Sequence, residues 1–549
     1  MNWPLQTQFK LSSAKCKLYR RRIAIPKRAY AFGTETRTEP HPIETEEKQS
    51  QASTLVAYAI ERFILFHNQN GEIFAKSNKT HETQRLESSQ FRDWLVSGYY
   101  AAFQQSPRDA AVREALSTLK SLGRYHAKRY NAEQHEVHIR VAKHEAAPHD
   151  TYYLDLGEPN QSNAVKIQAG EWMLVENPPV NFIRPNTLCA LPKPEHGGEI
   201  DLLWKIVNIP ENSRILVLTW LCECLRPETP FPVLELLGEQ GSAKSTTQTA
   251  LRLLIDPNTC NLRAAPKKVE DIFINANANW LVSYENISFL PANMQDAFCV
   301  LSTGGGYAKR RLFSNSDESV MQVKRPIILN GINASVTAQD LIDRAITVET
   351  PIIRERIEIT TLKRKFQAEQ GLILGALLTL MADALKHLPD IHLPVEDRPR
   401  LTEFARLGMA VARAMGKDSA DFMVQFNFSR QESIARTIDA SPVASAFIDW
   451  FETRNKQSIR LTLKNLLNAL NPYKPKNAEA WPQTAKALGD TLRRISPALR
   501  HMGIECISLG KTGGSITWEI SARERPPHKQ ACDQDLQDIQ DMPEAHSLA

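Results

Sequence analysis

A glycine-rich turn between an apolar strand and a helical pattern constrains this chain more than any other feature. The turn reads Gly238-Glu239-Gln240-Gly241-Ser242-Ala243-Lys244-Ser245-Thr246, with an apolar run at 231–237 before it and a helix-forming run at 247–255 after it. Backbone N–H groups in such a turn point inward, and the helix N-terminus adds partial positive charge. The context therefore predicts a nucleotide-binding strand, loop and helix, the alternative being a glycine turn with a chance lysine.

Individual residues of the turn have expected roles. Lys244 is expected to reach the β- and γ-phosphates of ATP, and Ser245 to hold Mg²⁺. Ala243 stands where the usual G-x-x-x-x-G-K-[ST] pattern has its second glycine, and since Ala tolerates positive φ poorly, we expect a slightly reshaped loop. The residues expected to contact the nucleotide are Gly238, Gln240, Gly241, Ser242, Ala243, Lys244, Ser245 and Thr246.

Length and composition indicate a globular protein of several domains. The 549 residues suffice for about three domains, and the hydrophobic fraction of 42% and charged fraction of 23% are ordinary for soluble proteins. No run of eighteen apolar residues occurs, so no membrane-spanning helix is expected. The eight cysteines are scattered, and the close pair Cys222 and Cys224 suits neither zinc nor a redox pair. Free thiols in a reducing cytoplasm are the expected state.

The two ends of the chain differ from its middle. Residues 1–34 contain eight Lys and Arg and no acid, which predicts a disordered basic arm, with a transit-like peptide or a nucleic-acid-binding arm as alternatives. An acidic linker follows to residue 52, and residues 523–549 read as a disordered acidic tail. Between these ends we expect an α/β multidomain protein, with an α+β domain at 53–199, the nucleotide core with a helical lead-in at 200–355, a helical segment at 356–435, and a compact domain at 440–522.

Three polar residues beyond the turn could complete an ATP-hydrolysing site. Glu285 ends an apolar strand and is the candidate acid beside the metal, while Asn286 occupies the slot where a second acid often sits. Asn330 ends a later strand, where it could hold the lytic water or the γ-phosphate. Arg344 could act on a neighbouring subunit as an arginine finger, or could form an intrachain salt bridge with Asp340 or Asp343. Glu285 could also be a surface residue that caps its strand.

A basic segment lies between the two acid- and amide-ended strands. Three glycines at 304–306 and Tyr307 precede Lys309, Arg310 and Arg311. This composition favours a flexible loop or hairpin that grips a phosphate backbone, and the alternative is a solvated turn.

The order of these motifs resembles that of superfamily III helicases, a branch of the AAA+ ATPases, and especially the ATPase part of phage- and plasmid-type primase–helicases. The segment from Asp317 to Val320 and that from Arg325 to Ile332 carry the resemblance most clearly, and it covers residues 200–355. It implies a hexameric ring that translocates on single-stranded or forked DNA. It also implies a Walker A pair in Lys244 and Ser245, a Walker B acid in Glu285, a sensor in Asn330, a finger in Arg344 and a DNA-gripping hairpin at 309–311.

The compact domain at 440–522 reads as three helices followed by two strands around a turn at 511–514. This order resembles a winged helix, whose third helix would place Arg493 and Arg494 in the major groove and whose wing would carry Lys511. Winged helices also mediate protein contacts, so DNA binding is one of two interpretations.

The leading hypothesis is an ATP-driven DNA helicase or translocase that replicates a mobile element, with any primase on a separate chain because residues 53–199 show no paired-carboxylate motif. A replication initiator that binds ATP and DNA without unwinding is the second hypothesis. The third is an AAA+ switch in anti-phage defence that nucleic acid triggers.

Overall fold

The computed structural model describes residues 50–125, 134–144, 150–310, 318–395, 398–439, 441–475, 481–512 and 515–522. The expected basic arm, most of the acidic linker, the acidic tail and Arg311 lie outside these residues. The chain divides into two compact units, Met1–Glu136 and Val137–Ala549. Each unit is described by itself below.

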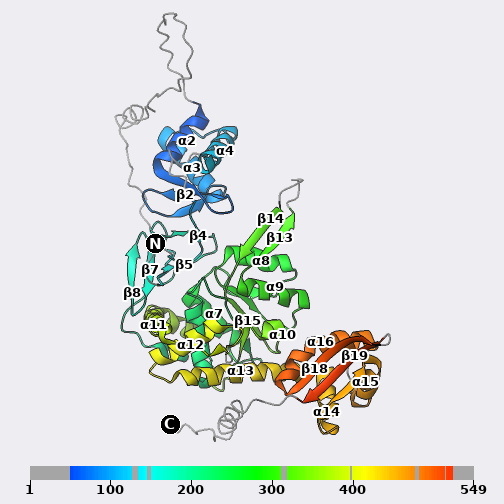
Figure 1. Ribbon diagram of the computed structural model, residues 1–549. Helices are drawn as coiled ribbons and strands as arrows, with labels where there is room; N and C mark the ends of the chain where they lie inside the picture. Colours follow the sequence, from blue (N-terminus) through cyan, green and yellow to red (C-terminus); the bar gives the residue numbers. More distant parts are fainter. Residues whose placement is uncertain are drawn as a thin grey trace, which may run out of the picture. The chain divides into compact units, whose positions relative to one another are not determined.

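The described part of the first unit packs three helices on a small antiparallel sheet (Figure 1). Ser50 caps the first helix by accepting the N–H of Ser53, and Ser88 caps the second by accepting that of Phe91. Apolar residues at helical spacing, among them Leu55, Leu95 and Leu119, meet in one buried cluster. The elements are α2 (Gln51–Arg62), β1 (Phe63–His67), β2 (Ile73–Ser77), β3 (Thr83–Arg85), α3 (Ser89–Phe103) and α4 (Asp109–Tyr125).

The boundary between the units differs from the expected domain at 53–199, because the second half of that range belongs to the second unit. Strands β5, β6, β7 and β8 form the expected antiparallel hairpins in that order, whereas β4 and β9 pair parallel in a separate two-stranded sheet. The run 136–141, which was expected to be one strand, is divided between β4 and β5. The fully buried Arg140 joins this sheet to the core through an ion pair with Asp256, with 3.1 Å between Nε and Oδ1. The strands are β4 (Val137–His138), β5 (Val141–Lys143), β6 (Tyr152–Asp155), β7 (Asn163–Gln168), β8 (Glu171–Glu176) and β9 (Asn181–Phe182).

A five-stranded parallel sheet in the order β11-β12-β15-β10-β16 forms the centre of the second unit. Strands β10 and β15 are buried along their whole length, as expected of a parallel sheet covered on both faces. The lead-in is a short 3₁₀ turn η1 (Ile200–Lys205), a second turn η2 (Glu211–Ser213) and the buried helix α6 (Arg214–Glu223). The sheet and its helices are β10 (Val233–Leu237), α7 (Lys244–Ile255), β11 (Arg263–Ala264), α8 (Val269–Ala278), β12 (Val282–Glu285), α9 (Ala292–Thr303), β15 (Ile327–Gly331), α10 (Gln339–Ile342) and β16 (Ala345–Glu349).

An antiparallel hairpin is inserted between α9 and β15. It consists of β13 (Gly305–Arg310) and β14 (Glu318–Val323), and it extends beyond α8 and α9 (Figure 1). The basic segment therefore adopts the hairpin alternative, with Lys309 and Arg310 at the far end of β13.

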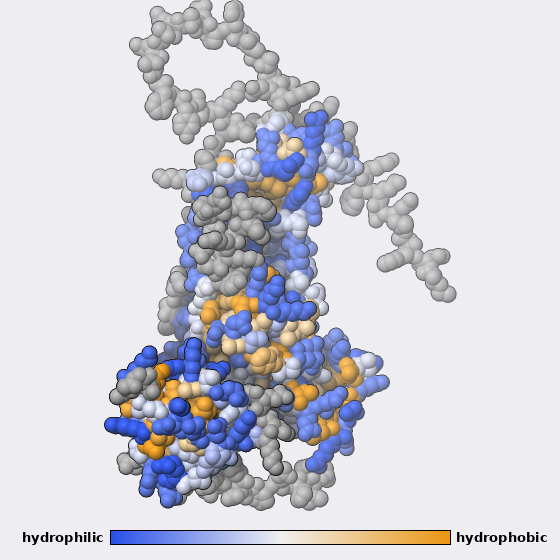
Figure 2. Space-filling model, turned by 90° about the vertical axis from the view of Figure 1, so that its right-hand side faces the viewer, coloured by the Kyte–Doolittle hydropathy of each residue, from blue (hydrophilic) through white to orange (hydrophobic). Residues whose placement is uncertain are grey.

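Three helices follow the sheet, namely α11 (Ile359–His387), α12 (Thr402–Ala414) and α13 (Ser419–Asp439), with a 3₁₀ turn η3 (Leu388–Asp390) after α11. Within the described residues, the segment Ile359–Asp390 has the length and composition to cross a membrane, but 72% of its most apolar window is buried inside the protein. On the face shown in Figure 2, apolar side chains form separate patches in a mainly hydrophilic surface.

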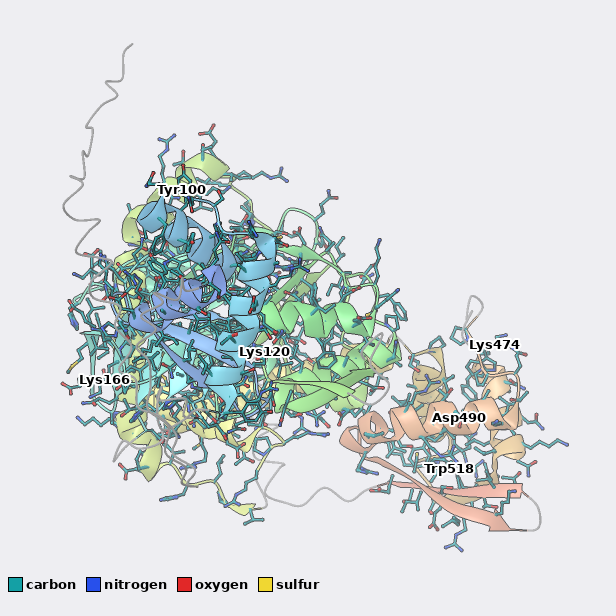
Figure 3. All side chains as sticks on the ribbon, turned by 90° about the horizontal axis from the view of Figure 1, so that it is seen from above. Tyr100, Lys120, Lys166, Lys474, Asp490 and Trp518 are labelled. Carbon is teal, nitrogen blue, oxygen red and sulfur yellow. The ribbon has the colours of Figure 1, made fainter. Side chains whose placement is uncertain are left out.

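The last domain has three helices and a three-stranded sheet in the order β17-β19-β18. Strand β17 was not predicted from the sequence, because its four residues are too short to show alternation. Trp518 is buried between the sheet and the helices, and Asp490 lies on α16 (Figure 3). The elements are α14 (Pro442–Thr453), β17 (Ile459–Thr462), α15 (Leu463–Leu470), the turn η5 (Asn471–Tyr473), α16 (Ala485–His501), β18 (Ile504–Thr512) and β19 (Ser515–Ala522).

Candidate nucleotide site

The glycine turn leaves the carboxyl end of β10 and leads directly into α7. Gly238 has φ +150° and Gly241 has φ +94°, conformations that side-chain-bearing residues rarely adopt. Ala243 has φ +55° and ψ +28°, so it takes the left-handed conformation that a glycine would take at this position. For an L-residue this conformation costs about 1–2 kcal/mol, so Ala243 is strained in the folded protein.

Lys244 folds back on its own loop. Its Nζ donates to the carbonyl oxygens of Gly238 and Glu239, both at 2.7 Å, and to Ser242 Oγ at 3.3 Å. Burial lowers the pKa of this ammonium group. The three acceptors are uncharged, and phosphate oxygens would be stronger partners at the same place. The loop therefore suits a nucleotide phosphate, with the hydroxyl of Ser245 half-exposed at the first turn of α7.

Two residues outside the motif hold the loop in place. The hydroxyls of Thr350 and Ser242 are 2.8 Å apart, and a Cβ on Gly238 would come within 2.5 Å of Thr350 Oγ1. Asn208 Nδ2 donates to the carbonyl oxygens of Ser242 at 2.9 Å and Pro351 at 2.6 Å. Neither Asn208 nor Thr350 was identified from the sequence, because such long-range contacts leave no local pattern.

The candidate acid and the candidate sensor lie at the carboxyl ends of adjacent strands. Glu285 ends β12 and is partly exposed, and within the described residues its carboxylate makes no hydrogen bond or ion pair. Asn330 is the last residue but one of β15 and is 1% exposed. The backbone N–H of Asn286 donates to Asn330 Oδ1 at 2.9 Å. Asn286 itself has φ +53°, a conformation in which Asn is favoured, so its presence has a backbone reason.

Gln248 connects these strand ends to the helix of the phosphate loop. Asn330 Nδ2 donates to Gln248 Oε1 at 2.5 Å, and Gln248 Nε2 donates to Ser283 Oγ at 2.8 Å and to the Tyr284 carbonyl at 3.0 Å. Gln248 is fully buried. The sequence reasoning missed it, although its position four residues after Lys244 places both on one face of α7.

Arg344 lies at the amino end of β16, and the phosphate loop of its own chain lies at the opposite, carboxyl end of the neighbouring strand β10. Its carbonyl oxygen accepts the N–H of Val233, the first residue of β10, whereas the loop follows the last. Its guanidinium forms an ion pair with Asp340, which also pairs with Arg400 at 2.5 Å. Burial of Asp340 opposes ionisation, but hydrogen bonds from Cys299 and Arg344 and the charges of both arginines outweigh it and lower the pKa. Within the single chain, Arg344 therefore forms the intrachain salt bridge with Asp340 that the sequence offered as the alternative to an arginine finger.

Arg356 is a cation that the sequence reasoning missed. Its side chain is exposed, and its Nη2 would lie 3.1 Å from a Cβ placed on Gly241. It follows β16 by a short connection and faces the phosphate loop of the same chain. A guanidinium there suits a bound phosphate.

Glu235 is a buried acid in the middle of β10. Its Oε1 accepts hydrogen bonds from Ser335 N at 2.8 Å, Ser335 Oγ at 2.9 Å and Val336 N at 3.0 Å, while its Oε2 accepts one from Thr347. Burial raises the pKa of this carboxyl despite these bonds. Glu235 therefore fixes the segment that follows β15 against the strand that carries the phosphate loop.

The predicted DNA-binding residues lie away from this site. Lys309 and Arg310 pair in register with Ser319 and Glu318 on the hairpin. On α16, Arg493 forms an exposed ion pair with Asp490 at 3.0 Å, and Arg494 is exposed beside it. Lys511 is exposed near the end of β18. Across the described ranges no group of three or more His, Cys, Asp or Glu side chains could hold a metal ion.

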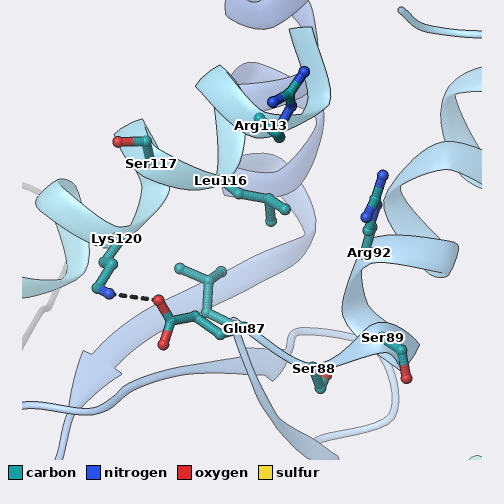
Figure 4. Close-up of a pocket in the computed structure, with 9 residues that line it drawn as sticks. Glu87, Ser88, Ser89, Arg92, Arg113, Leu116, Ser117 and Lys120 are labelled. Carbon is teal, nitrogen blue, oxygen red and sulfur yellow. Dashed lines mark hydrogen bonds and ion pairs between the residues drawn. The ribbon is translucent and has the colours of Figure 1, made fainter. Parts of the chain in front are cut away.

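A cavity of about 570 Å³ lies in the first unit, lined by α3, α4 and the end of the small sheet (Figure 4). It contains the three cations Arg92, Arg113 and Lys120. Arg92 and Arg113 both pair with Asp109, and Lys120 pairs with Glu87, so most of this positive charge is neutralised.

Comparisons with solved structures gave only distant likenesses. The apo C-terminal region of NrS-1 is 12% identical, with 86% of this chain and 99% of that chain covered and a TM-score of 0.38. A JCV helicase with a bound acetamide compound is 13% identical, with 40% of this chain and 71% of that chain covered and a TM-score of 0.19. Both scores are below 0.5, so neither likeness decides fold or function. No curated protein matched this chain.

Two protein-family models match the chain. The "Actinomycete integrative conjugative element replication protein" model matches residues 200–423, which hold the parallel sheet and the helices after it. The model for the C-terminal domain of the same replication protein matches residues 443–533. Together they match more than half of the 549 residues. Over these residues the chain is similar to both domains of the replication protein of actinomycete integrative conjugative elements.

Proposed function

We propose that this protein is an ATP-dependent DNA helicase or translocase that acts in the replication of a mobile element. The observation that carries the proposal is the hydrogen-bonded connection between three strand ends. Lys244 follows β10, Glu285 ends β12 and Asn330 lies near the end of β15. Gln248 and Asn286 connect these strand ends through hydrogen bonds. Ligands of open parallel sheets bind at these carboxyl ends.

The proposed ligands are ATP and Mg²⁺, which when bound would supply a charged γ-phosphoryl group and neutralise its developing charge. Lys244 would bind the phosphates, and Ser245 and Glu285 would hold the metal ion. Asn330 would orient the attacking water or contact the γ-phosphate, since Gln248 fixes its amide. The remaining loop residues, Gly238 to Thr246, would donate backbone N–H groups to the phosphates.

We further propose an AAA+-type core, in the superfamily III manner, that assembles as a hexameric ring. The strand order β11-β12-β15-β10-β16 and the inserted hairpin support this interpretation. In a ring, Arg344 would exchange its pairing with Asp340 for the nucleotide of a neighbouring copy, since it cannot reach the phosphate loop of its own chain. Lys309, Arg310 and Arg311 would contact single-stranded or forked DNA, and the last domain would act as a winged helix through Arg493, Arg494 and Lys511.

A second candidate function is a replication initiator that binds ATP and DNA without unwinding. Asn286 favours it, because the slot often held by a second acid is here an amide with a left-handed backbone. The two functions differ in turnover. The test is the ATPase rate of the full chain with and without single-stranded DNA, followed by strand displacement on a forked substrate. DNA-stimulated turnover with displacement supports the helicase, and a nucleotide-dependent DNA footprint without turnover supports the initiator.

A further inference from the structure

The segment that follows β16 is tied to the phosphate loop at two points. Thr350 is 2% exposed, and its hydroxyl donates to the carbonyl oxygen of Leu237, the last residue of β10, at 2.8 Å. The carbonyl oxygen of Pro351 accepts a hydrogen bond from Asn208 Nδ2 at 2.6 Å, and the same amide group donates to the Ser242 carbonyl at 2.9 Å. The chain after Pro351 therefore starts from a fixed position beside the loop.

Arg356 is the cation by which this segment reaches the loop. A Cβ built on Gly241 would lie 3.1 Å from Arg356 Nη2, closer than most contacts of real Cβ atoms, so a larger residue at position 241 would press on the guanidinium. Gly241 also has φ +94°, a conformation that by itself favours glycine. The absence of a side chain at Gly241 thus leaves room for the arginine.

The charge of Arg356 is not compensated within the described residues. Its side chain is exposed, and it forms neither a hydrogen bond nor an ion pair with any described group. The carboxylates closest to it in the sequence, Glu355 and Glu358, do not pair with it, and neither does Glu239 of the loop. A guanidinium without a carboxylate partner is available to a phosphate group, whose oxygens match its planar fork.

The contact with Gly241 places Arg356 on the side of the β- and γ-phosphates of a nucleotide in this loop. Lys244 Nζ lies against the carbonyl oxygens of Gly238 and Glu239, and the lysine of such a loop reaches these two phosphates. Gly241 belongs to the same turn, between Glu239 and Lys244. A guanidinium beside Gly241 is therefore directed to the terminal phosphates rather than to the base.

We propose that Arg356 binds the γ-phosphate of the ATP held in its own chain and makes the site prefer ATP to ADP. This role rests on the proposed function, because it requires a nucleotide at the phosphate loop. It differs from the role proposed for Arg344, which acts on a neighbouring copy and needs the ring, whereas Arg356 acts within one chain. A single chain should therefore distinguish the two nucleotides before any assembly.

The test compares the affinities of the full chain for ADP and for a non-hydrolysable ATP analogue, both with Mg²⁺, by titration calorimetry. Arg356→Gln should raise the dissociation constant of the ATP analogue about tenfold, because it removes a charged hydrogen-bond donor, and that of ADP by less than about twofold. Arg356→Lys keeps the charge but not the fork, so it should restore part of the preference. The melting temperature without nucleotide should stay the same in both variants, since the exposed side chain has no partner in the described part of the chain.

Arg354→Gln is the matched control, because Arg354 is exposed on the same segment and its replacement removes the same charge. It should change both affinities alike and by less than about twofold. An equal effect of Arg356→Gln on the two nucleotides, or one no larger than that of Arg354→Gln, would overturn the proposal while nucleotide binding stands. Binding of neither nucleotide by the wild type would instead contradict the proposed function, and the role of Arg356 with it.

The oligomeric state of the titrated samples separates action within one chain from action across an interface. Light scattering reports this state at each protein concentration. A loss of ATP preference in Arg356→Gln that is present in single chains supports the proposal. A loss that occurs only in assembled chains would place Arg356 at the nucleotide of a neighbouring copy and overturn it.

Discussion

Asn330 Oδ1 accepts the backbone N–H of Asn286 at 2.9 Å, which ties the end of β15 to the residue that follows the candidate acid Glu285. The amide of Asn330 cannot rotate freely, because its Nδ2 donates to Gln248 Oε1 at 2.5 Å. The orientation of the candidate sensor is thus set by Gln248, whose side chain forms its hydrogen bonds with Asn330, Ser283 and the backbone of the neighbouring strands.

Gln248→Leu should destabilise the protein by about 1–3 kcal/mol, because it leaves Asn330 Nδ2 and Ser283 Oγ without this partner in a buried site. It should also slow ATP hydrolysis more than it weakens nucleotide binding, since Asn330 loses its fixed orientation. Chemical denaturation and steady-state kinetics measure the two effects. Thr249→Ala is the matched control on α7, because the Thr249 hydroxyl donates to the Ser245 carbonyl of its own helix and to no other group in the described part of the chain. This variant should change stability by about 0.5 kcal/mol or less. Equal losses in the two variants would contradict the positioning role.

Ala243→Gly should leave stability unchanged or raise it by up to about 1 kcal/mol. Glycine relieves the left-handed strain at φ +55°, and the greater freedom of the unfolded chain offsets part of the gain. Ala250→Gly, in the interior of the same helix, should instead cost about 1 kcal/mol. Thermal denaturation distinguishes the unchanged or higher stability expected of Ala243→Gly from the lower stability expected of Ala250→Gly. A loss of stability in Ala243→Gly as large as that in Ala250→Gly would show that the strain is absent.

The stability of the protein should carry a pH dependence from Glu235. The pKa of Glu235 is raised in the folded state, so its protonation favours the folded protein. The stability that this titration contributes is fully present below the pKa of the unfolded chain, about 4.5, and is lost as pH rises through the pKa of the folded protein. Glu235→Gln removes this titration, and its amide can still accept from Ser335 and donate to Thr347. The variant should therefore gain stability relative to the wild type as pH rises above about 4.5. Denaturation curves at several pH values test this, and parallel curves for the two proteins would refute it.

Double replacement Arg493→Ala and Arg494→Ala should weaken duplex DNA binding and make it less sensitive to salt. If each arginine neutralises one phosphate, the slope of log affinity against log salt should fall by about one to two units. Arg460→Ala is the control, because Arg460 is exposed on β17 and pairs with Glu519 rather than lying on α16. Similar slopes for the wild type and the double variant would favour a protein-binding role for this domain.

The sequence predicted the local features of the fold, and its failures involved contacts between distant residues. The phosphate loop, the hairpin at 305–323 and the antiparallel strands after residue 136 follow from local composition and period. The boundary at Glu136 could not be predicted, because the Arg140–Asp256 ion pair that joins the small sheet to the core spans 116 residues. Strand β11 has two residues, too few for any pattern.

The candidate site shows the same division. Lys244, Glu285 and Asn330 were predicted because each follows an apolar strand. Asn208 and Thr350 lie outside the motif and are recognised only through their bonds to Ser242. The left-handed backbone conformation of Asn286 gives a reason for an asparagine at the position where a second acid often sits.

The most direct test of the central claim is the ATPase rate against single-stranded DNA concentration, for the wild type and Lys244→Ala, at two salt concentrations. A DNA motor predicts stimulation in the wild type that disappears in Lys244→Ala and weakens steeply at higher salt, because phosphate contacts release counterions. An ATPase rate that is the same at every DNA concentration would contradict the motor and leave the phosphate loop a role in assembly alone.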